Sequence, residues 1–256
     1  MPAIQCSGAT LYYEDHGDGA PVVFLHGATA GLRYFEPQST GLSDEYRCLA
    51  FDFGGYGRSE KTELGHTLSQ HARDLRAFLD RLDLDDAVVV GWSRGAIVSC
   101  EYVDQFGTDR LRALVDVDME PSPLQRAGYD YGSYTLEGLG DALVRIQTNP
   151  LELLDKQIEA LLNDPPSRER RITMFDEGSR IPPPISGAML LELMRDYRDV
   201  LSEIDVPTLV CAGADEKWRR PRRSSTRRNS SRTPDSNSSR GADTVSPSKS
   251  PRRSIE

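Results

Sequence analysis

The feature that most restricts the fold of this chain is a strand that passes through one serine into a helix. Residues 87–93, AVVVGWS, form a continuous apolar run with three successive valines, which is typical of a strand covered on both faces. Residues 94–107 follow with a helical pattern that ends at Gly107, a residue type that often closes helices. This direct passage from strand to helix indicates an α/β fold.

The serine at the junction lies in the pattern Gly91-Trp92-Ser93-Arg94-Gly95, a G-x-S-x-G. Ser93 has to occupy a strained turn that directs its side chain outward, so the pattern needs small residues on both sides. The helix that begins at residue 94 points its free N–H groups at the same place and favours negative charge there. The alternative interpretation is an ordinary strand–helix turn with a solvent-facing serine.

Strands and helices alternate along most of the chain. Residues 121–200 differ, because they contain helical patterns and no convincing strand. We therefore predict a mostly parallel sheet flanked by helices, with a helical cap. The predicted strands are two short ones around Gly8 and five within 22–27, 46–53, 87–93, 111–118 and 206–215. The predicted core helices are 67–82 and 94–107, and Thr67 with Gln70 forms a capping box at the start of the first.

The composition changes abruptly after Trp218. Residues 217–256 hold 12 basic and 3 acidic side chains, a net charge of +9, whereas the first 216 residues hold 19 basic and 37 acidic ones, a net charge of −18. An acidic body therefore precedes a basic tail, and a preference of the body for nucleic acid does not follow. We expect core segments at 1–120 and 201–218, a cap at 121–200, and a disordered Arg/Ser-rich tail at 219–256.

Three origins of the tail remain open. A frameshift or misjoined reading frame is favoured by the abrupt change at residue 219. A genuine arm could bind phosphates or anionic surfaces, but it lacks interleaved aromatic residues, which makes nucleic acid a poor candidate partner. A tail that folds back on the acidic body is the third possibility.

The remaining composition indicates a plain soluble chain. The four cysteines are scattered and have no CxxC pair, so we expect free buried thiols and no metal site: Cys6, Cys48, Cys100 and Cys211. We expect no signal peptide, since no basic region precedes an apolar one, and no apolar run approaches the roughly 20 residues of a membrane span. A cytoplasmic protein without a cofactor is the expectation.

Several further motifs carry a family resemblance. FLHGA at 24–28 resembles the His-Gly segment of the α/β-hydrolase fold family, and FDFGGYGRSE at 51–60 resembles its D-x-x-G-x-G-x-S loop, with Gly54 where Arg or Pro is usual. Residues 103–123 and 195–213 look like its esterase and non-haem haloperoxidase branch. The resemblance covers roughly residues 8 to 218 and implies that the last strand and helix of the family are absent.

The resemblance implies acyl chemistry on a small ester-like substrate. Ser93 would attack a carbonyl and form an acyl-enzyme, and the backbone N–H groups of Ala28 and Arg94 would stabilise the oxyanion. A serine nucleophile argues against the dehalogenase and epoxide-hydrolase relatives, which use Asp. For the Arg94 side chain, a surface salt link is the usual outcome, and a cation near the acyl group is the alternative.

The family order is Ser, then Asp or Glu, then His. We choose Asp215 as the acid, with Glu216 as a close alternative and Asp118 as a third.

The base is missing from the sequence. The four histidines, His16, His26, His66 and His71, all precede Ser93. The resemblance gives His26 a loop-shaping role, and we expect His66 and His71 to face water. We therefore expect an impaired hydrolase; the alternative is a non-catalytic protein whose basic tail binds anionic partners.

Overall fold

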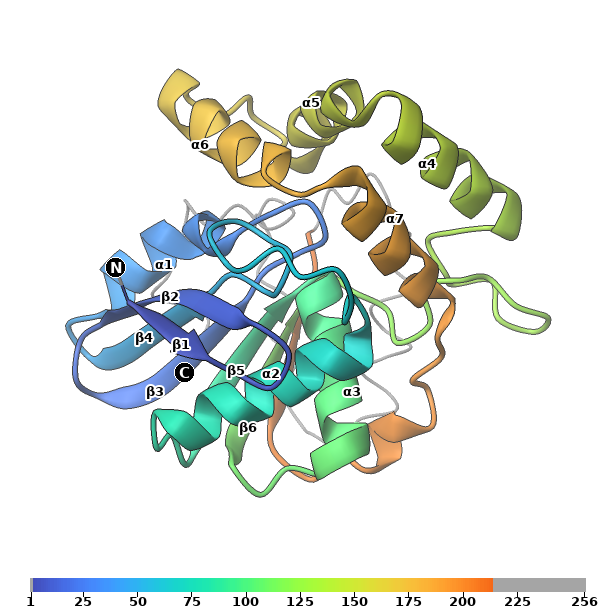
Figure 1. The fold of residues 1–256 in the computed structure, drawn as a ribbon. Helices are drawn as coiled ribbons and strands as arrows, with labels where there is room; N and C mark the ends of the chain where they lie inside the picture. The colour runs from blue at the N-terminus through green and yellow to red at the C-terminus, as the bar shows by residue number, and fades with distance from the viewer. Residues whose placement is uncertain (1, 214–256) are drawn as a thin grey trace.

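The computed structural model describes residues 2–213, and Figure 1 shows their arrangement. The strands are β1 (Ala3–Gln5), β2 (Thr10–His16), β3 (Ala20–Leu25), β4 (Tyr46–Phe51), β5 (Ala87–Trp92), β6 (Leu111–Val117) and β7 (Thr208–Cys211). The α-helices are α1 (Glu36–Leu42), α2 (Leu68–Arg81), α3 (Arg94–Phe106), α4 (Leu136–Thr148), α5 (Pro150–Leu161), α6 (Arg168–Ser179) and α7 (Pro183–Leu191). Short 3-10 helices are η1 (Leu32–Phe35), η2 (Glu192–Met194) and η3 (Val200–Ser202).

The seven strands form one sheet in the order β1-β2-β4-β3-β5-β6-β7. β4, β3, β5, β6 and β7 run parallel, and β1 and β2 add an antiparallel edge. β5 lies between β3 and β6, with Leu25 opposite Gly91 and Trp92 opposite Val117. The predicted mostly parallel sheet is confirmed.

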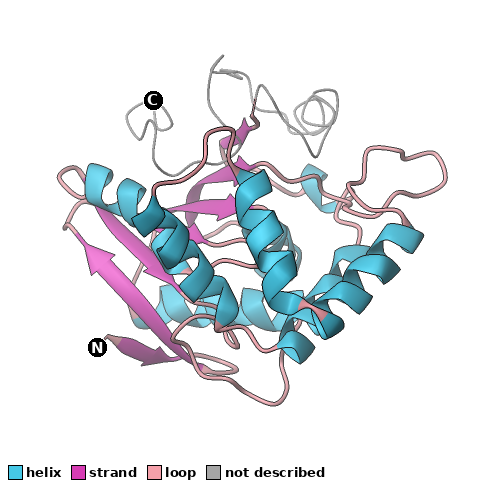
Figure 2. Cartoon of the chain, turned by 90° about the horizontal axis from the view of Figure 1, so that it is seen from above, coloured by secondary structure: helices cyan, strands magenta, loops and turns pink. Residues whose placement is uncertain are grey.

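Helices cover both faces of this sheet (Figure 2). Successive side chains of a strand point to opposite faces, so Val23 and Leu25 of β3 pack with residues of α2 and α3, while Val22 and Phe24 pack with η1. Both faces are apolar, which explains why the central strands show no alternation in the sequence.

The two predicted core helices begin and end close to their expected residues. The Thr67 side chain accepts a hydrogen bond from Gln70 N at 3.1 Å and caps α2. Gly107 closes α3 with a positive φ of 68°. The expectation for His71 is wrong: its ring is buried and stacks on Phe53, with 4.7 Å between ring centroids. His66 is half-buried, and its Nε2 contacts Thr62 O at 2.8 Å.

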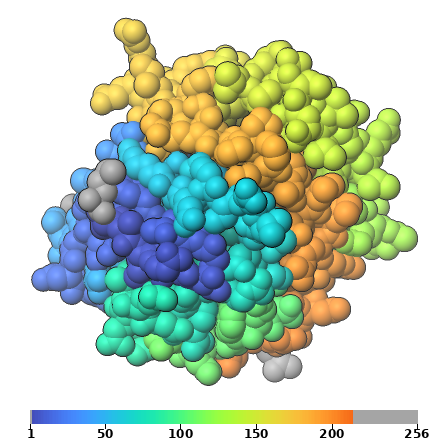
Figure 3. All heavy atoms as spheres, viewed as in Figure 1, coloured from blue at the N-terminus to red at the C-terminus, as the bar shows by residue number. Residues whose placement is uncertain are grey.

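Helices α4 to α7 form the cap and lie over the end of the sheet at which α3 begins (Figure 1). Figure 3 shows the loop after β4, in cyan, directly beneath α7, in orange. Leu68 N at the start of α2 donates to Glu192 Oε2 at 2.9 Å, which ties the core to the residues after α7. Within 121–200 the described β-structure is limited to isolated bridges. The predicted segment boundaries stay predictions.

Two groups of expectations fall outside the described residues: the acids Asp215 and Glu216, and the tail at 219–256 with its missing last strand and helix. All four cysteines are described as free thiols, three of them buried and Cys211 half-buried. Among the described helices, none combines the length and apolarity that a membrane crossing requires.

Candidate active site

Ser93 lies in the middle of the sheet, at the carboxyl end of β5, with φ 52° and ψ −119°. A positive φ is unfavourable for any residue with a side chain and persists only where the surroundings impose it. Ser93 N donates to Val117 O at 2.9 Å, and Ser93 O accepts from Ala96 N at 3.0 Å, so β6 and α3 hold the turn. The strained turn expected from the G-x-S-x-G pattern is present.

The two glycines of the pattern are required by space. A Cβ on Gly91 would lie 2.6 Å from the Ala96 backbone, and a Cβ on Gly95 would lie 2.1 Å from Leu25 O. Both neighbours are backbone atoms that cannot rotate away. The close approach of α3 to β5 and β3 therefore depends on these glycines.

The loops that follow β3 and β6 flank Ser93, because the neighbouring strands are parallel and end at the same edge. After β3 come His26, Gly27 and the half-buried Ala28; after β6 come Asp118 and Met119. Met119 Sδ lies 4.0 Å from Ser93 Oγ. Asp118 has a φ of 57°, and its N–H donates to Cys211 O at 2.8 Å.

The His-Gly segment is held by a buried imidazole. His26 Nε2 accepts from Phe53 N at 3.1 Å, and His26 Nδ1 lies 2.8 Å from Gly27 O, to which it donates. Burial, and after it the charge of Arg94, lowers the pKa of His26 well below its ordinary value. A neutral His26 therefore ties the segment before Ala28 to the loop after β4, which fits the loop-shaping role that the resemblance implies.

The expectation for the Arg94 side chain is wrong. Arg94 is 1% exposed, and its guanidinium lies over the rings of Tyr56 and Phe53, with Cζ 4.1 Å and 4.7 Å from their centroids. Among residues 2–213, none provides a hydrogen-bond partner for its three guanidinium nitrogens, and burial lowers its pKa. No described carboxylate forms a salt bridge with it, and the loop at 51–60 places the faces of two aromatic rings against it instead.

A second buried charged group lies where α6 meets the core. Glu177 is 0% exposed and has no hydrogen-bond partner in the part of the chain that is described, and a Cβ on Gly31 would lie 1.9 Å from its Oε2. Beside it, Asp52 accepts from Leu32 N and Arg58 N, both at 2.8 Å. Burial and the Asp52 carboxylate raise the pKa of Glu177 to about 7.

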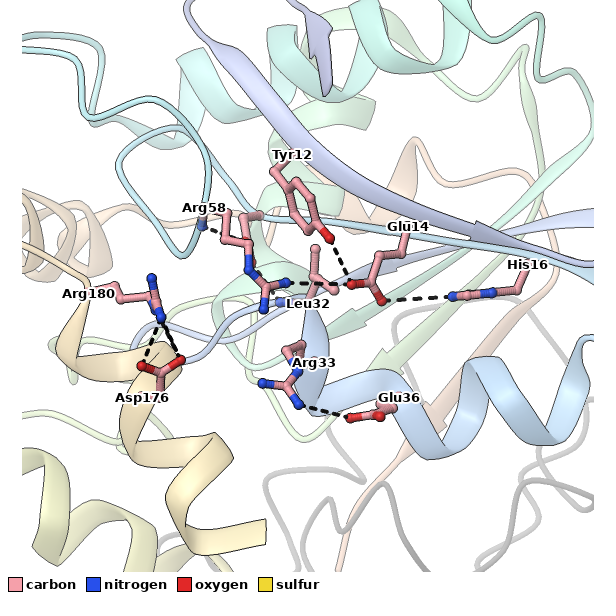
Figure 4. Close-up of polar contacts among 10 residues, drawn as sticks. Tyr12, Glu14, His16, Leu32, Arg33, Glu36, Arg58, Asp176 and Arg180 are labelled. Atoms are coloured by element: carbon pink, nitrogen blue, oxygen red, sulfur yellow. Dashed lines mark hydrogen bonds and ion pairs between the residues drawn. The ribbon is translucent and has the colours of Figure 1, made fainter. Parts of the chain in front are cut away.

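Ion pairs surround this junction. Figure 4 shows Arg58 with Glu14 on the core side and Arg180 with Asp176 on the α6 side. Neither Glu177 nor the aromatic floor around Arg94 was found from the sequence. Glu177 lies in a helix with charged residues on every side, so its burial has no periodic signal.

Of the predicted acids, Asp118 alone belongs to the described residues, one position after the Val117 carbonyl that accepts from Ser93 N. Of the described side chains, Met119 alone has a polar atom within hydrogen-bonding range of Ser93 Oγ. No histidine of the described part therefore reaches the serine. Residues 2–213 also contain no group of His, Cys, Asp and Glu that could hold a metal ion.

Comparisons with known proteins agree with this architecture. The model of the alpha/beta hydrolase fold family matches residues 20–165. An AB hydrolase superfamily protein, YisY, of Bacillus subtilis is 28% identical over 212 residues, which are 81% of this chain and 78% of that protein. A non-heme chloroperoxidase of Streptomyces lividans is 28% identical over 237 residues, covering 82% and 80%.

Solved structures share the fold. An esterase from Exiguobacterium antarcticum superposes with a TM-score of 0.85 at 24% identity, covering 90% of this chain and 87% of the esterase. A bromoperoxidase from Bacillus anthracis superposes with a TM-score of 0.84 at 22% identity, covering 90% and 88%. The chain thus belongs to the α/β-hydrolase fold family, and the proteins that it resembles include an esterase and two haloperoxidases.

Proposed function

We propose that this protein is a serine hydrolase of ester-like carbonyl bonds in small molecules, with Ser93 as the nucleophile. The observation that carries the proposal is the backbone of Ser93, with φ 52° and ψ −119° at the carboxyl end of the central strand. Such strain is costly and serves to expose a side chain to a reacting group. Family membership supports the reaction class.

In the proposed mechanism Ser93 Oγ attacks the carbonyl carbon, and the resulting acyl-enzyme is hydrolysed by water. The N–H groups of Ala28 and Arg94 stabilise the negative oxygen of the tetrahedral intermediate. They lie at the carboxyl end of β3 and at the start of α3, on two sides of the Ser93 turn. No cofactor is required for these steps.

Asp215 is the proposed acid, with Glu216 as the alternative. Asp118 is the remaining candidate, and its position directly after β6, beside the Ser93 turn, supports it. The proposed base is absent from the 256 residues, since every histidine precedes Ser93. A serine without its base retains only about 10³–10⁴-fold catalysis over water, so we propose that this chain is impaired.

Labelling with a fluorophosphonate probe tests both parts of the proposal. We expect slow labelling that is lost in Ser93→Ala. Added imidazole should act as an external base and raise the labelling rate in proportion to its concentration, without labelling Ser93→Ala. Fast labelling that imidazole does not change would contradict the missing base, and labelling that survives in Ser93→Ala would contradict the nucleophile.

A non-catalytic binding protein is the second candidate, and the net charge of +9 in residues 217–256 supports it. Electrostatic binding to an anionic polymer should weaken steeply with salt. We expect it to be lost when the four arginines within 219–223 are replaced by serine. Absence of imidazole-stimulated labelling together with salt-sensitive heparin binding would favour this candidate. A cytoplasmic location is the matching proposal for either function.

A further inference from the structure

The guanidinium of Arg94 is a buried positive charge with no counter-charge in the described part of the chain. It is 1% exposed, and no described residue accepts a hydrogen bond from its nitrogens. Burial of an unpaired cation is among the most expensive arrangements in a protein interior. Arg94 is also the first residue of α3, and the positive end of a helix dipole makes a cation there less favourable still. A methionine or leucine would fill this site at lower cost.

The groups around the guanidinium are aromatic rings, which present π-electrons but carry no negative charge. The rings of Tyr56 and Phe53 face it, and cation–π attraction offsets part of the cost. Two imidazoles belong to the same cluster: His26 lies 5.3 Å from the Tyr56 ring and His71 lies 4.7 Å from the Phe53 ring, centroid to centroid.

Both imidazoles are neutral. Burial, followed by the charge of Arg94, lowers the pKa of His26 and of His71 well below the ordinary value. The buried carboxylate of the loop at 51–60, Asp52, accepts from the backbone of Leu32 and Arg58 and forms no hydrogen bond with Arg94. The cluster therefore keeps one whole positive charge.

This charge belongs to the residue that directly follows the candidate nucleophile. Arg94 follows Ser93 directly, and its side chain packs on the loop that holds the His26–Gly27 segment through the bond from Phe53 N to His26 Nε2. That segment leads to Ala28. An exposure of 1% excludes direct contact between the guanidinium and a substrate, so any effect has to act through the low-dielectric interior.

We infer that the Arg94 side chain is the counter-charge for the oxyanion at Ser93, a positioning residue that stabilises the anionic tetrahedral state from beneath the active site. The inference rests on the proposed function, since it needs an anion on Ser93. It is separate from the role of the Arg94 backbone N–H, which every substitution except proline preserves. It predicts that the charge of the side chain matters more than its shape.

An alkylboronic acid supplies the required anion without a complete catalytic triad. Ser93 Oγ loses its proton to solvent and bonds to boron, and boron becomes tetrahedral with a formal charge of −1. Affinity measured by calorimetry, with the tetrahedral adduct identified by ¹¹B NMR, reports on stabilisation of that charge. We expect the unaltered chain to bind, and Ser93→Ala not to form the adduct.

Arg94→Met and Arg94→Gln should bind the boronic acid at least about tenfold more weakly, and Arg94→Lys should keep most of the affinity, because electrostatic stabilisation of this kind follows charge. The matched control is Arg170→Met, which removes a charge over the ring of Tyr34, in the apolar cluster on the other face of the sheet from Phe53 and Tyr56. Equal affinity in Arg94→Met and the unaltered chain would overturn the inference and leave the proposed function standing. Lack of any adduct in the unaltered chain would overturn both.

Discussion

Two regions of the molecule each bury a charged group: the floor of the active site, formed by Arg94, Phe53 and Tyr56, and the cap junction, where Glu177 of α6 meets the core. They accommodate the charge in opposite ways. Arg94 in the floor keeps its charge beneath the rings of Tyr56 and Phe53. Glu177 in the cap junction has a pKa of about 7 and can become neutral by binding a proton. A guanidinium keeps its proton, and therefore its charge, at any ordinary pH. A permanent charge is thus held beneath the candidate nucleophile, and a titratable one is held where the cap meets the core.

Two helix glycines, one beside the active site and one in the cap, differ in how tightly their surroundings are packed. In the floor, Gly95 lies so close to β3 that an added methyl group would meet the Leu25 carbonyl. In the cap, a Cβ on Gly140 of α4 would meet nothing within 4 Å. Gly95 therefore has no room for a side chain, whereas Gly140 has.

Among the proposed variants, Gly95→Ala should lower the free energy of unfolding the most. The new Cβ would lie 2.1 Å from Leu25 O, so α3 has to move away from β3, and we expect a loss of about 3 kcal/mol or more in the free energy of unfolding. Urea denaturation measures it. Gly140→Ala is the control and should gain about 0.5–1 kcal/mol, because alanine is the better helix former. Similar values for the two variants would contradict the contrast in packing.

Glu177→Gln should change the pH dependence of stability. The pKa of Glu177 is about 7 in the folded protein against 4.5 ordinarily, so the folded state keeps a proton that the unfolded state has lost. Stability should then fall as pH rises from about 4.5 to 7, by up to about 3 kcal/mol from this group.

Denaturation curves at pH 5, 6, 7 and 8 test this prediction. Glu177→Gln lacks the fall, so its advantage over the unaltered chain should grow with pH. Asp155→Asn is the control, since that carboxylate is 45% exposed and pairs with Arg171 of α6, away from the buried carboxyl group. Parallel pH profiles for Glu177→Gln and the unaltered chain would show that the carboxyl group does not titrate as described.

Arg94→Met and Arg170→Met should shift stability in opposite directions. Replacing the unpartnered Arg94 by an unbranched apolar side chain removes a desolvation cost, and we expect a gain of about 1–2 kcal/mol. Arg170 donates to Arg33 O at 3.0 Å and to Tyr34 O at 2.8 Å, so its loss should cost about 1–2 kcal/mol. Thermal unfolding monitored by circular dichroism gives both signs, and destabilisation by Arg94→Met would argue that an unseen partner satisfies the guanidinium.

The smallest effects concern two helix caps. Thr67 caps α2 in the core by accepting from Gln70 N, and Thr135 caps α4 in the cap by accepting from Gly138 N at 3.0 Å. Alanine at either position should cost about 1 kcal/mol. Hydrogen exchange distinguishes them: if 121–200 unfold as one unit, Thr135→Ala should speed exchange only there, while Thr67→Ala should act on the core. Uniform changes in both variants would contradict the predicted boundary.

Local patterns were sufficient to predict the sheet, α2, α3 and the strained turn. The valines of β5, the Thr67 cap and the terminal Gly107 act through neighbours in the chain, so their effects can be read from short stretches. The predictions for His71 and Arg94 were wrong because both depend on a distant loop. Phe53 and Tyr56 cover these polar groups with aromatic faces. Helical periodicity cannot predict this burial, because the covering residues lie outside the helix.

The sequence alone determined the family, the place of Ser93 and the absence of a histidine after residue 71, because each is carried by residues that are contiguous or can be counted. The tertiary structure decided the surroundings of that serine. It brought Met119 from β6 to Ser93, Phe53 and Tyr56 to Arg94, and Glu177 to Asp52. These contacts join residues far apart in the chain, and the electrostatics of a buried group depends on what surrounds it in space.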